Sequence, residues 1–280
     1  KCTPEENKQT CEYQFSRMLF TLLQEMTGIE VPWGLLTGIR PVRKAFSMME
    51  ESGKSLDAVM EQLRTVYLVS PEKISLLRKT AEVQLPLLRQ TPKRSVGFYI
   101  SIPFCPTRCS YCSFVSHSIA QAQNLIPAYL EKLCEELKIW GQLVREQELL
   151  ADTVYFGGGT PSLLTPRQVS RLIEAAAPVS GAEITLEANP ETVTGESLRG
   201  FRAAGVNRIS FGVQSARDSQ LRTLGRPHTA RQAHAAFAAA RQAGFENISG
   251  DIMLALPHYT QAEFDETLEL IETGGATHIS

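Results

Sequence analysis

The sequence lacks a long hydrophobic run. Although 43% of its 280 residues are apolar, no stretch approaches the roughly 20 consecutive apolar residues that a bilayer-spanning helix needs. The N-terminal segment also lacks the charged, apolar and small-residue regions of a secretory signal. These absences predict no membrane span and favour a cytoplasmic protein.

An excess of charge of either sign is also missing. The chain has 28 Lys and Arg residues against 30 Asp and Glu residues. A broad cationic surface for nucleic acid or for an anionic membrane is therefore not expected. An anionic ligand would have to be bound by individual arginines.

Several common catalytic and phosphate-binding motifs are absent. No glycine-rich turn is followed by the Gly-Lys-Ser/Thr of a P-loop, and no dinucleotide-binding fingerprint is present. The five histidines lack the pairwise spacing of a metal site, and no nucleophile elbow accompanies them. These absences exclude the P-loop, dinucleotide-binding and Ser-His-Asp hydrolase classes as interpretations.

Three of the six cysteines are concentrated in the stretch YISIPFCPTRCSYCS, at Cys105, Cys109 and Cys112. This crowding suits metal ligands in a reducing compartment better than a disulfide framework. Three cysteines can hold three corners of a cubane iron-sulfur cluster and leave one iron open, whereas an electron-carrying cluster normally takes four thiolates. Two alternatives remain: a closed Cys3His zinc site that includes His117, and three buried, unreactive thiols.

Residues 1–92 are expected to form a helical N-terminal domain and a linker. Apolar residues recur at steps of three and four from Phe15 to Met26, which predicts a helix with one buried face. Further helices are predicted at about 55–66 and 71–84.

From residue 93 onward, short apolar strands alternate with helical patterns. The strands are expected at about 97–102, 152–156, 183–187, 208–213, 249–254 and from 277 onward. This βα repetition predicts a parallel sheet. The expected fold is α/β, a partial (β/α)6 barrel over residues 93–280 that follows the small helical domain. We expect the chain to be a fragment, truncated in or after the sixth strand.

Functional groups of parallel barrels gather where strands end, and unusual residues follow successive strands here. The cysteines follow the first strand and the glycines of YFGGGTPS follow the second; glycines allow a sharp turn with exposed backbone groups. Glu187 ends the third strand, Gln214 follows the fourth, and Asp251 lies on the fifth. A buried Asp251 needs a specific donor, and Arg226 can bind a carboxylate through two hydrogen bonds.

The cysteine spacing, with Tyr111 directly before Cys112, resembles that of the radical S-adenosylmethionine (SAM) enzymes. With the glycine motif and the later residues, the sequence is most similar to the oxygen-independent coproporphyrinogen III oxidase group, and within it to HemZ-type members. The similarity is strong over residues 93–280 and weaker over Gly34–Arg43. In this family the open iron of the cluster is chelated by the amino and carboxylate groups of SAM.

The resemblance implies a [4Fe-4S] cluster held by Cys105, Cys109 and Cys112, with SAM as the second cofactor. The positions that match SAM-binding residues of the family are Tyr99, Tyr111, Gly158, Gly159, Thr160, Glu187, Gln214, Arg226 and Asp251.

The resemblance further implies a radical SAM oxidoreductase of porphyrin and haem biosynthesis. A flavodoxin- or ferredoxin-like donor would reduce the cluster, and reductive cleavage of SAM would give methionine and a 5'-deoxyadenosyl radical. The radical would take hydrogen from a propionate of coproporphyrinogen III, and loss of carbon dioxide and an electron would leave a vinyl group. Repetition on a second propionate would give protoporphyrinogen IX. Arg108 and Arg222 are candidate contacts to the carboxylates of this tetrapyrrole substrate.

Two positions depart from the family pattern. Ser101 stands where the oxidases and their haem-chaperone relatives commonly carry His, and Phe114 stands where the oxidases carry another Cys. A haem-binding chaperone of the same family is therefore the main alternative function. A third is another radical SAM enzyme that acts on tetrapyrroles, such as a methyltransferase or a haem-opening enzyme. Ser101 and the helical segment before residue 92 favour the HemZ-type interpretation.

Overall fold

The structure is a computed structural model that describes residues 4–38, 40–114 and 116–280. The chain divides into two compact units, Lys1–Pro92 and Lys93–Ser280. Ile39, which belongs to the segment similar to HemZ-type proteins, lies outside the described residues.

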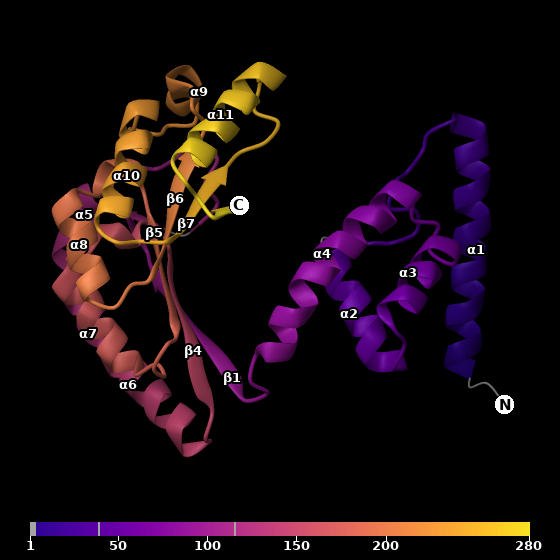
Figure 1. Ribbon diagram of the computed structural model, residues 1–280, viewed down its shortest axis with the longest axis horizontal. Helices are drawn as coiled ribbons and strands as arrows, with labels where there is room; N and C mark the ends of the chain where they lie inside the picture. The colour runs from indigo at the N-terminus through magenta and orange to yellow at the C-terminus, as the bar shows by residue number, and fades with distance from the viewer. Residues whose placement is uncertain (1–3, 39, 115) are drawn as a thin grey trace. The chain divides into compact units, whose positions relative to one another are not determined.

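The first unit consists of helices (Figure 1). They are α1 (Pro4–Thr27), α2 (Pro41–Ser52), α3 (Leu56–Thr65) and α4 (Pro71–Gln90). Ser55 and Ser70 precede α3 and α4, and their hydroxyls accept hydrogen bonds from backbone N–H groups of the first turn. The helices predicted at 55–66 and 71–84 are confirmed, and α4 continues past Pro86.

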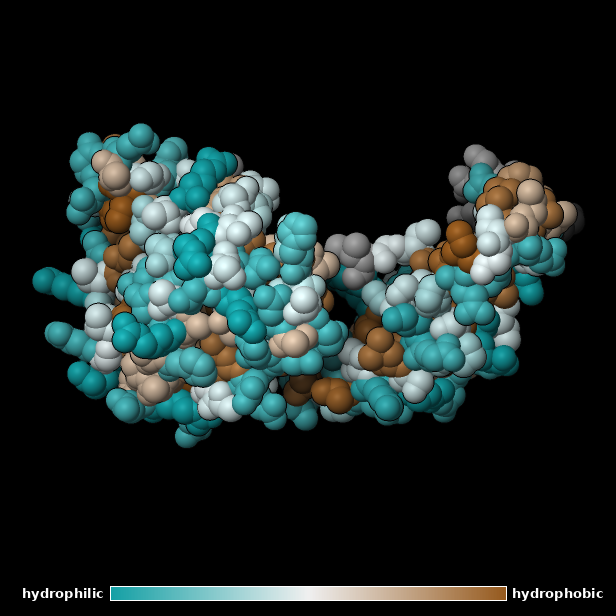
Figure 2. Space-filling model, turned by 90° about the horizontal axis from the view of Figure 1, so that it is seen from above, coloured by the Kyte–Doolittle hydropathy of each residue, from teal (hydrophilic) through white to brown (hydrophobic). Residues whose placement is uncertain are grey.

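The prediction that α1 has a buried apolar face is wrong. Its large apolar side chains are between 44% and 73% exposed, at Phe15, Met18, Leu19, Leu22, Leu23 and Met26. The core of this unit is built from α2, α3, α4 and the turn before α4. Helix α1 contacts the rest of the unit through the side that carries Tyr13, whose hydroxyl donates a hydrogen bond to the Val66 carbonyl. Hydrophobic side chains accordingly lie at the surface of this unit (Figure 2).

The second unit is built around a parallel sheet. Within the described residues, six strands pair in chain order: β1 (Ser95–Ile102), β4 (Leu150–Gly158), β5 (Glu183–Ala188), β6 (Arg208–Gln214), β7 (Asn247–Ile252) and β8 (His278–Ile279). Every neighbouring pair is parallel. The α/β fold class is confirmed, and the six-stranded sheet is open, as expected of a partial barrel.

Helices connect these strands. They are α5 (Ile119–Ala122), α6 (Ile126–Glu146), α7 (Pro166–Ala176), α8 (Gly195–Ala203), α9 (Asp218–Thr223), α10 (Ala230–Gln242) and α11 (Gln261–Thr273). Thr165, Thr194, Thr229 and Thr260 each cap the helix that follows, through a reciprocal hydrogen-bond pair with the third helical residue. These caps fix where each helix begins after its strand.

The two faces of the sheet differ in chemistry. One face carries apolar side chains such as Ile102, Phe156 and Phe211, which form a core with residues from α6, α7, α8, α10 and α11; α6, α7, α8 and α10 lie along one side of the strands in Figure 1. Because side chains alternate along a strand, the other face carries polar ones, among them Glu187 and Asp251. The sheet therefore has a polar inner face that leads to the ends of the strands.

A second, small pairing closes the cysteine segment. Strands β2 (Phe104–Cys105) and β3 (His117–Ser118) form a parallel pair, and the His117 backbone N–H donates to the Pro103 carbonyl at 2.8 Å. The described residues between them are thereby held in a loop, here called the cysteine loop (104–114 and 116–118). No helix in the described part of the chain is long and apolar enough to cross a membrane.

Candidate cofactor-binding site

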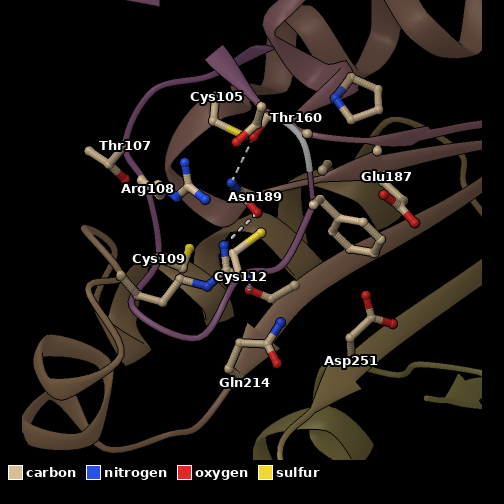
Figure 3. A pocket seen from close by; sticks show the side chains of 18 of the residues that line it. Cys105, Thr107, Arg108, Cys109, Cys112, Thr160, Glu187, Asn189, Gln214 and Asp251 are labelled. Atoms are coloured by element: carbon tan, nitrogen blue, oxygen red, sulfur yellow. Dashed lines mark hydrogen bonds between the residues drawn. The ribbon is translucent and has the colours of Figure 1, made fainter. Parts of the chain in front are cut away.

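A cavity lies at the carboxyl ends of the strands, beside the cysteine loop (Figure 3). Its lining includes residues from the cysteine loop and from the ends of β4, β5, β6 and β7, namely Cys105, Thr107, Arg108, Cys109, Tyr111, Cys112, Phe114, Ser116, Gly158, Gly159, Thr160, Pro161, Glu187, Ala188, Asn189, Ser210, Gly212, Gln214, Arg226 and Asp251. The cavity thus combines thiols, carboxylates, amides and guanidinium groups at one edge of the sheet.

Backbone hydrogen bonds hold the cysteine loop on two sides. On one side, the N–H groups of Gly159 and Thr160 donate to the carbonyls of Ile102 and Phe104 at 2.9 and 2.8 Å. On the other side, the Ser110 N–H donates to the Leu224 carbonyl at 3.0 Å. The loop is therefore attached both to the glycine turn after β4 and to the end of α9.

Gly159 is required by the close approach of these two segments. A Cβ atom at this position would lie 2.7 Å from the carbonyl oxygens of Ile102 and Phe104, and 3.0 Å from the Cys105 Sγ. Any side chain would push the glycine turn away from the cysteine loop. At Gly158 the φ angle is +99°, in a region that glycine adopts more easily than other residues.

The three cysteines are partly buried, unpaired thiols that line the cavity. Within the described residues, no three Cys, His, Asp or Glu side chains converge closely enough to hold one metal ion. A closed zinc site needs four ligands around a single ion, and His117 does not line the cavity. The fourth ligand of the zinc alternative therefore lies outside the cavity that the three cysteines line, and partly buried thiols at a cavity wall differ from the fully buried, unreactive thiols of the other alternative.

The two carboxylates of the cavity are held by hydroxyl donors. Tyr155 donates to Glu187 Oε1 at 2.8 Å, and Ser210 donates to Asp251 Oδ1 at 3.0 Å. Burial raises the pKa of Glu187, and the nearby charge of Asp251 adds to this rise. Burial likewise raises the pKa of Asp251. Both groups are therefore poorly solvated anions that a hydroxyl-rich or cationic ligand would stabilise.

Asn189 connects two further parts of the wall. The Arg226 Nη1 donates to Asn189 Oδ1 at 2.9 Å, and the Asn189 Nδ2 donates to Thr160 Oγ1 at 3.3 Å. A second bond runs from Arg226 Nη2 to the Gly212 carbonyl at 3.3 Å. The Arg226 Nε is buried without a hydrogen-bond partner among the described residues. The guanidinium therefore keeps an unused donor beside the cavity.

Two more lining residues have unusual local states. Gln214 adopts a φ of +66° at a register shift between β6 and β7, a conformation that costs energy for a residue other than glycine. Burial, opposed by the charge of Arg226, raises the pKa of Tyr111 to about 12. Tyr111 therefore stays neutral at physiological pH and can donate a hydrogen bond.

Residues 99–271 match the Radical SAM superfamily. The chain belongs to this superfamily. Members of the radical SAM family use a [4Fe-4S] cluster and SAM, so these are the cofactors of this chain.

Two curated relatives are similar to this radical SAM chain. The oxygen-independent coproporphyrinogen-III oxidase-like protein HemZ of Bacillus subtilis is 33% identical over 278 residues, which cover 96% of this chain and 55% of the relative. The heme chaperone HemW of Haemophilus influenzae is 36% identical over 193 residues, covering 66% of this chain and 50% of the relative. The chain thus spans about half the length of these relatives.

Among solved structures, coproporphyrinogen III oxidase (HemN) from Escherichia coli is similar with a TM-score of 0.60 and 28% sequence identity. The match covers 71% of this chain and 46% of that one. The parallel sheet of the second unit therefore has the HemN-like radical SAM fold.

The residues present fit the radical SAM cofactors. Three unpaired thiols share one loop. Gly159 lies close to Cys105, and because it has no side chain its backbone groups are unobstructed there. The buried, unpartnered Nε of Arg226 is a donor suited to a carboxylate. Polar side chains of β5, β6 and β7 complete the wall.

The structure brings together all but one of the residues that the sequence analysis selected for the cluster and for SAM. The exception is Tyr99, which is 61% exposed and does not line the cavity. Its ring instead stacks on Tyr155 at 5.7 Å between centroids, and Tyr155 contacts Glu187. Of the two candidate substrate arginines, Arg108 lines the cavity and Arg222 does not.

Sequence reasoning missed Asn189, Ser210 and Tyr155. Asn189 directly follows β5, so its place at a strand end was an available signal. Ser210 and Tyr155 lie on the polar face of their strands, where period-two alternation with buried apolar neighbours marks them. Nothing in the sequence indicates that Tyr155 donates to Glu187 across the sheet.

Proposed function

We propose that this radical SAM protein catalyses the oxygen-independent oxidative decarboxylation of coproporphyrinogen III to protoporphyrinogen IX, in porphyrin and haem biosynthesis. Two similarities support this proposal: the relative HemZ, named as oxidase-like, which matches nearly the whole chain, and the solved coproporphyrinogen III oxidase. In this proposal a flavodoxin- or ferredoxin-like protein supplies the electron, and the reaction takes place in the cytoplasm.

Cys105, Cys109 and Cys112 would hold the cluster. Arg226 would bind the carboxylate of SAM through its free Nε, and Glu187, Gln214 and Asp251 would bind the polar groups of the nucleoside and the amino acid part. Tyr111, Gly158, Gly159 and Thr160 complete this proposed set of SAM contacts, and Tyr99 would act through its contact with Tyr155. When bound, the cluster and SAM supply the one-electron chemistry that removes hydrogen from an unactivated carbon.

The observation that carries the tetrapyrrole assignment is the combination of Phe114 and Arg108 at the cavity. Phe114 is 61% exposed although it is a large apolar ring, and it lines the same cavity as the cysteines. Figure 3 shows Arg108 pointing from the cysteine loop into the cavity. A tetrapyrrole has a broad apolar ring system and carboxylate side chains. An exposed aromatic ring beside a guanidinium matches both parts.

The chain's own contribution to the reaction is placement and exclusion of water. The Glu187 and Asp251 carboxylates are held by Tyr155 and Ser210, so they face a bound ligand in fixed positions. No general base among these residues is required, because the substrate loses hydrogen, carbon dioxide and an electron. Preorganised contacts of this kind position the reacting carbon without reorganisation.

A haem-binding chaperone is the second candidate. Phe114 supports this function because the oxidases carry another Cys at this position, and this chain therefore lacks that cysteine at the cavity. The HemW relative, named as a heme chaperone, is 36% identical over 193 residues. In this function the same aromatic and cationic surface would hold haem for transfer instead of orienting a propionate.

An anaerobic assay separates the two functions. The purified protein, loaded with iron and sulfide and reduced with dithionite, is mixed with SAM and coproporphyrinogen III, and porphyrins and 5'-deoxyadenosine are quantified. The oxidase proposal predicts protoporphyrinogen IX with about two 5'-deoxyadenosines per product, one for each propionate. Stable stoichiometric haem binding without SAM cleavage would support the chaperone and reject the oxidase.

Two arginine variants test the substrate contact. Arg108→Ala should weaken tetrapyrrole binding at least about tenfold, the loss expected when a charge-assisted hydrogen bond is removed. The matched control is Arg222→Ala on α9, because this exposed arginine does not line the cavity. Equal affinities of the two variants would remove Arg108 from the site.

A further inference from the structure

A buried histidine and a nearly buried glutamate contact each other directly behind the cavity. The His228 side chain is fully buried and the Glu191 side chain is 13% exposed, and the distance from His228 Nδ1 to Glu191 Oε2 is 3.3 Å. These two atoms, and Glu191 Oε1 as well, are buried without a hydrogen-bond partner among the described residues, so the pair is a close contact between two unsatisfied polar groups. The other ring nitrogen, His228 Nε2, lies 3.1 Å from the Val213 carbonyl oxygen.

This geometry determines where the protons are. A carbonyl oxygen only accepts hydrogen bonds, so His228 Nε2 must carry the proton that it donates to Val213. In the neutral ring the other nitrogen, Nδ1, would then be an acceptor. An acceptor facing an ionised carboxylate at 3.3 Å, away from water, is unfavourable. The contact therefore requires one additional proton between Nδ1 and Oε2.

The pair joins two segments that both reach the cavity. Glu191 lies in the short helical turn η3 (Pro190–Thr192), two residues after Asn189. His228 lies two residues after Arg226, just before α10. Inside the cavity these segments meet through the bond from Arg226 Nη1 to Asn189 Oδ1. The segments are thus joined twice, once within the cavity and once behind it.

We propose that Glu191 and His228 form a proton-bridged clamp that positions Arg226 and Asn189 for the carboxylate of SAM. The clamp acts through these residues and does not touch the ligand, so both members are positioning residues. The proposal rests on the proposed function only for the identity of the ligand. When the clamp is broken, the segment that carries Arg226 is still held by the contact of His228 with the Val213 carbonyl and by the hydrogen bonds of Arg226 in the cavity. The Arg226 guanidinium then no longer has a fixed orientation.

The test compares two substitutions of Glu191 that differ in one capability. Glu191→Gln can turn an amide N–H toward the Nδ1 acceptor of a neutral His228, which replaces the bridging proton by a covalently held one. Glu191→Leu has similar bulk but neither donates nor accepts a hydrogen bond. Both variants, with Glu246→Leu as an exposed control, are reconstituted anaerobically. Iron content, SAM affinity by calorimetry, and the SAM-induced change in the electron paramagnetic resonance spectrum are measured.

The clamp predicts that Glu191→Leu binds a full complement of iron but binds SAM at least about tenfold more weakly, and that Glu191→Gln stays within about threefold of the parent. Parent-like SAM affinity of Glu191→Leu would overturn the proposal, as would equal losses in both variants. Arg226→Ala tests the role of Arg226 in SAM binding separately from the role of the clamp. If its SAM affinity is unchanged, the assigned role of Arg226 fails, whatever the state of the clamp.

A measurement on the unsubstituted protein covers the case in which Glu191→Leu does not fold. In iron-free, 15N-histidine-labelled protein, the His228 resonances should show a protonated Nε2 and an Nδ1 that carries or shares a proton. A bare, unprotonated Nδ1 without hydrogen-bond character would overturn the clamp. His228→Leu provides the assignment of the signal.

Discussion

Replacing Gly159 with alanine tests how the site is assembled. The added Cβ would lie 2.7 Å from two backbone carbonyl oxygens and 3.0 Å from the Cys105 Sγ. The two carbonyl oxygens are main-chain atoms that cannot turn away, so the glycine turn and the cysteine loop must separate. Gly159 does not have a positive φ, and the expected effect is therefore steric.

The size of the effect follows from two contributions. Forcing an extra methyl group into a packed region costs about 1–3 kcal/mol. Separation of the segments also weakens the bonds from the Gly159 and Thr160 N–H groups, each of which contributes about 1 kcal/mol. A total loss of about 2–4 kcal/mol lowers the melting temperature of a unit of this size by roughly 4–16 °C.

The assay is thermal unfolding of the iron-free protein, followed by the iron content of each variant after anaerobic reconstitution. Gly195→Ala is the matched control, because a Cβ there would meet only the Arg199 Nη1 at 3.5 Å. At this position, the first of α8, alanine should be neutral or stabilising by up to about 1 kcal/mol. A Gly159→Ala protein with the parent's melting temperature and iron content would refute the steric argument.

Three further predictions concern the cluster, the cavity carboxylate and the core. Cys112→Ala should lose most of its iron after reconstitution, whereas Cys134→Ala, on α6 and outside the cavity, should keep it; equal iron contents would contradict the ligand assignment. Burial raises the pKa of Glu187 above its usual 4.5, so the folded state binds its proton more tightly and the resulting stability, fully present below pH 4.5, is lost as pH rises through the folded pKa. Glu187→Gln should therefore become more stable relative to the parent as pH rises from about 4.5, and urea denaturation at several pH values would reveal a flat difference if this is wrong. Phe237→Ala should cost about 3–5 kcal/mol, because the buried Phe237 ring packs edge-to-face on Phe211 at 5.2 Å; a change below about 1 kcal/mol in urea denaturation would contradict this packing.

The strands could be predicted from the sequence because each carries its own signal. Alternating or continuous apolar residues mark β1, β4, β5, β6 and β7, and the capping threonines mark the helices between them. Since parallel strands end at one edge of the sheet, the convergence of Glu187, Gln214 and Asp251 with the cysteines followed from the fold alone. Local chemistry and chain order were sufficient for this part of the site.

Other features depend on partners far away in the chain. Helix α1 has an apolar stripe, but it contacts its unit through the side that carries Tyr13. The spacing of apolar residues in the sequence does not predict which side of the helix packs. Tyr99 matches a family position, yet its ring does not line the cavity and instead stacks on Tyr155. The double role of Asn189, as acceptor from Arg226 and donor to Thr160, requires three segments to be placed at once.

The attachment of the cysteine loop has a consequence for how this scaffold can diversify. The loop is fastened mainly by main-chain amides and carbonyls, at Gly159, Thr160 and Ser110, and such bonds are indifferent to the side chains that the loop displays. Substitutions at Arg108 or Phe114 can therefore accumulate without loosening the loop. Substitutions in the loop can in this way change which ligand binds at the mouth of the cavity, while the positions of the three thiols stay the same.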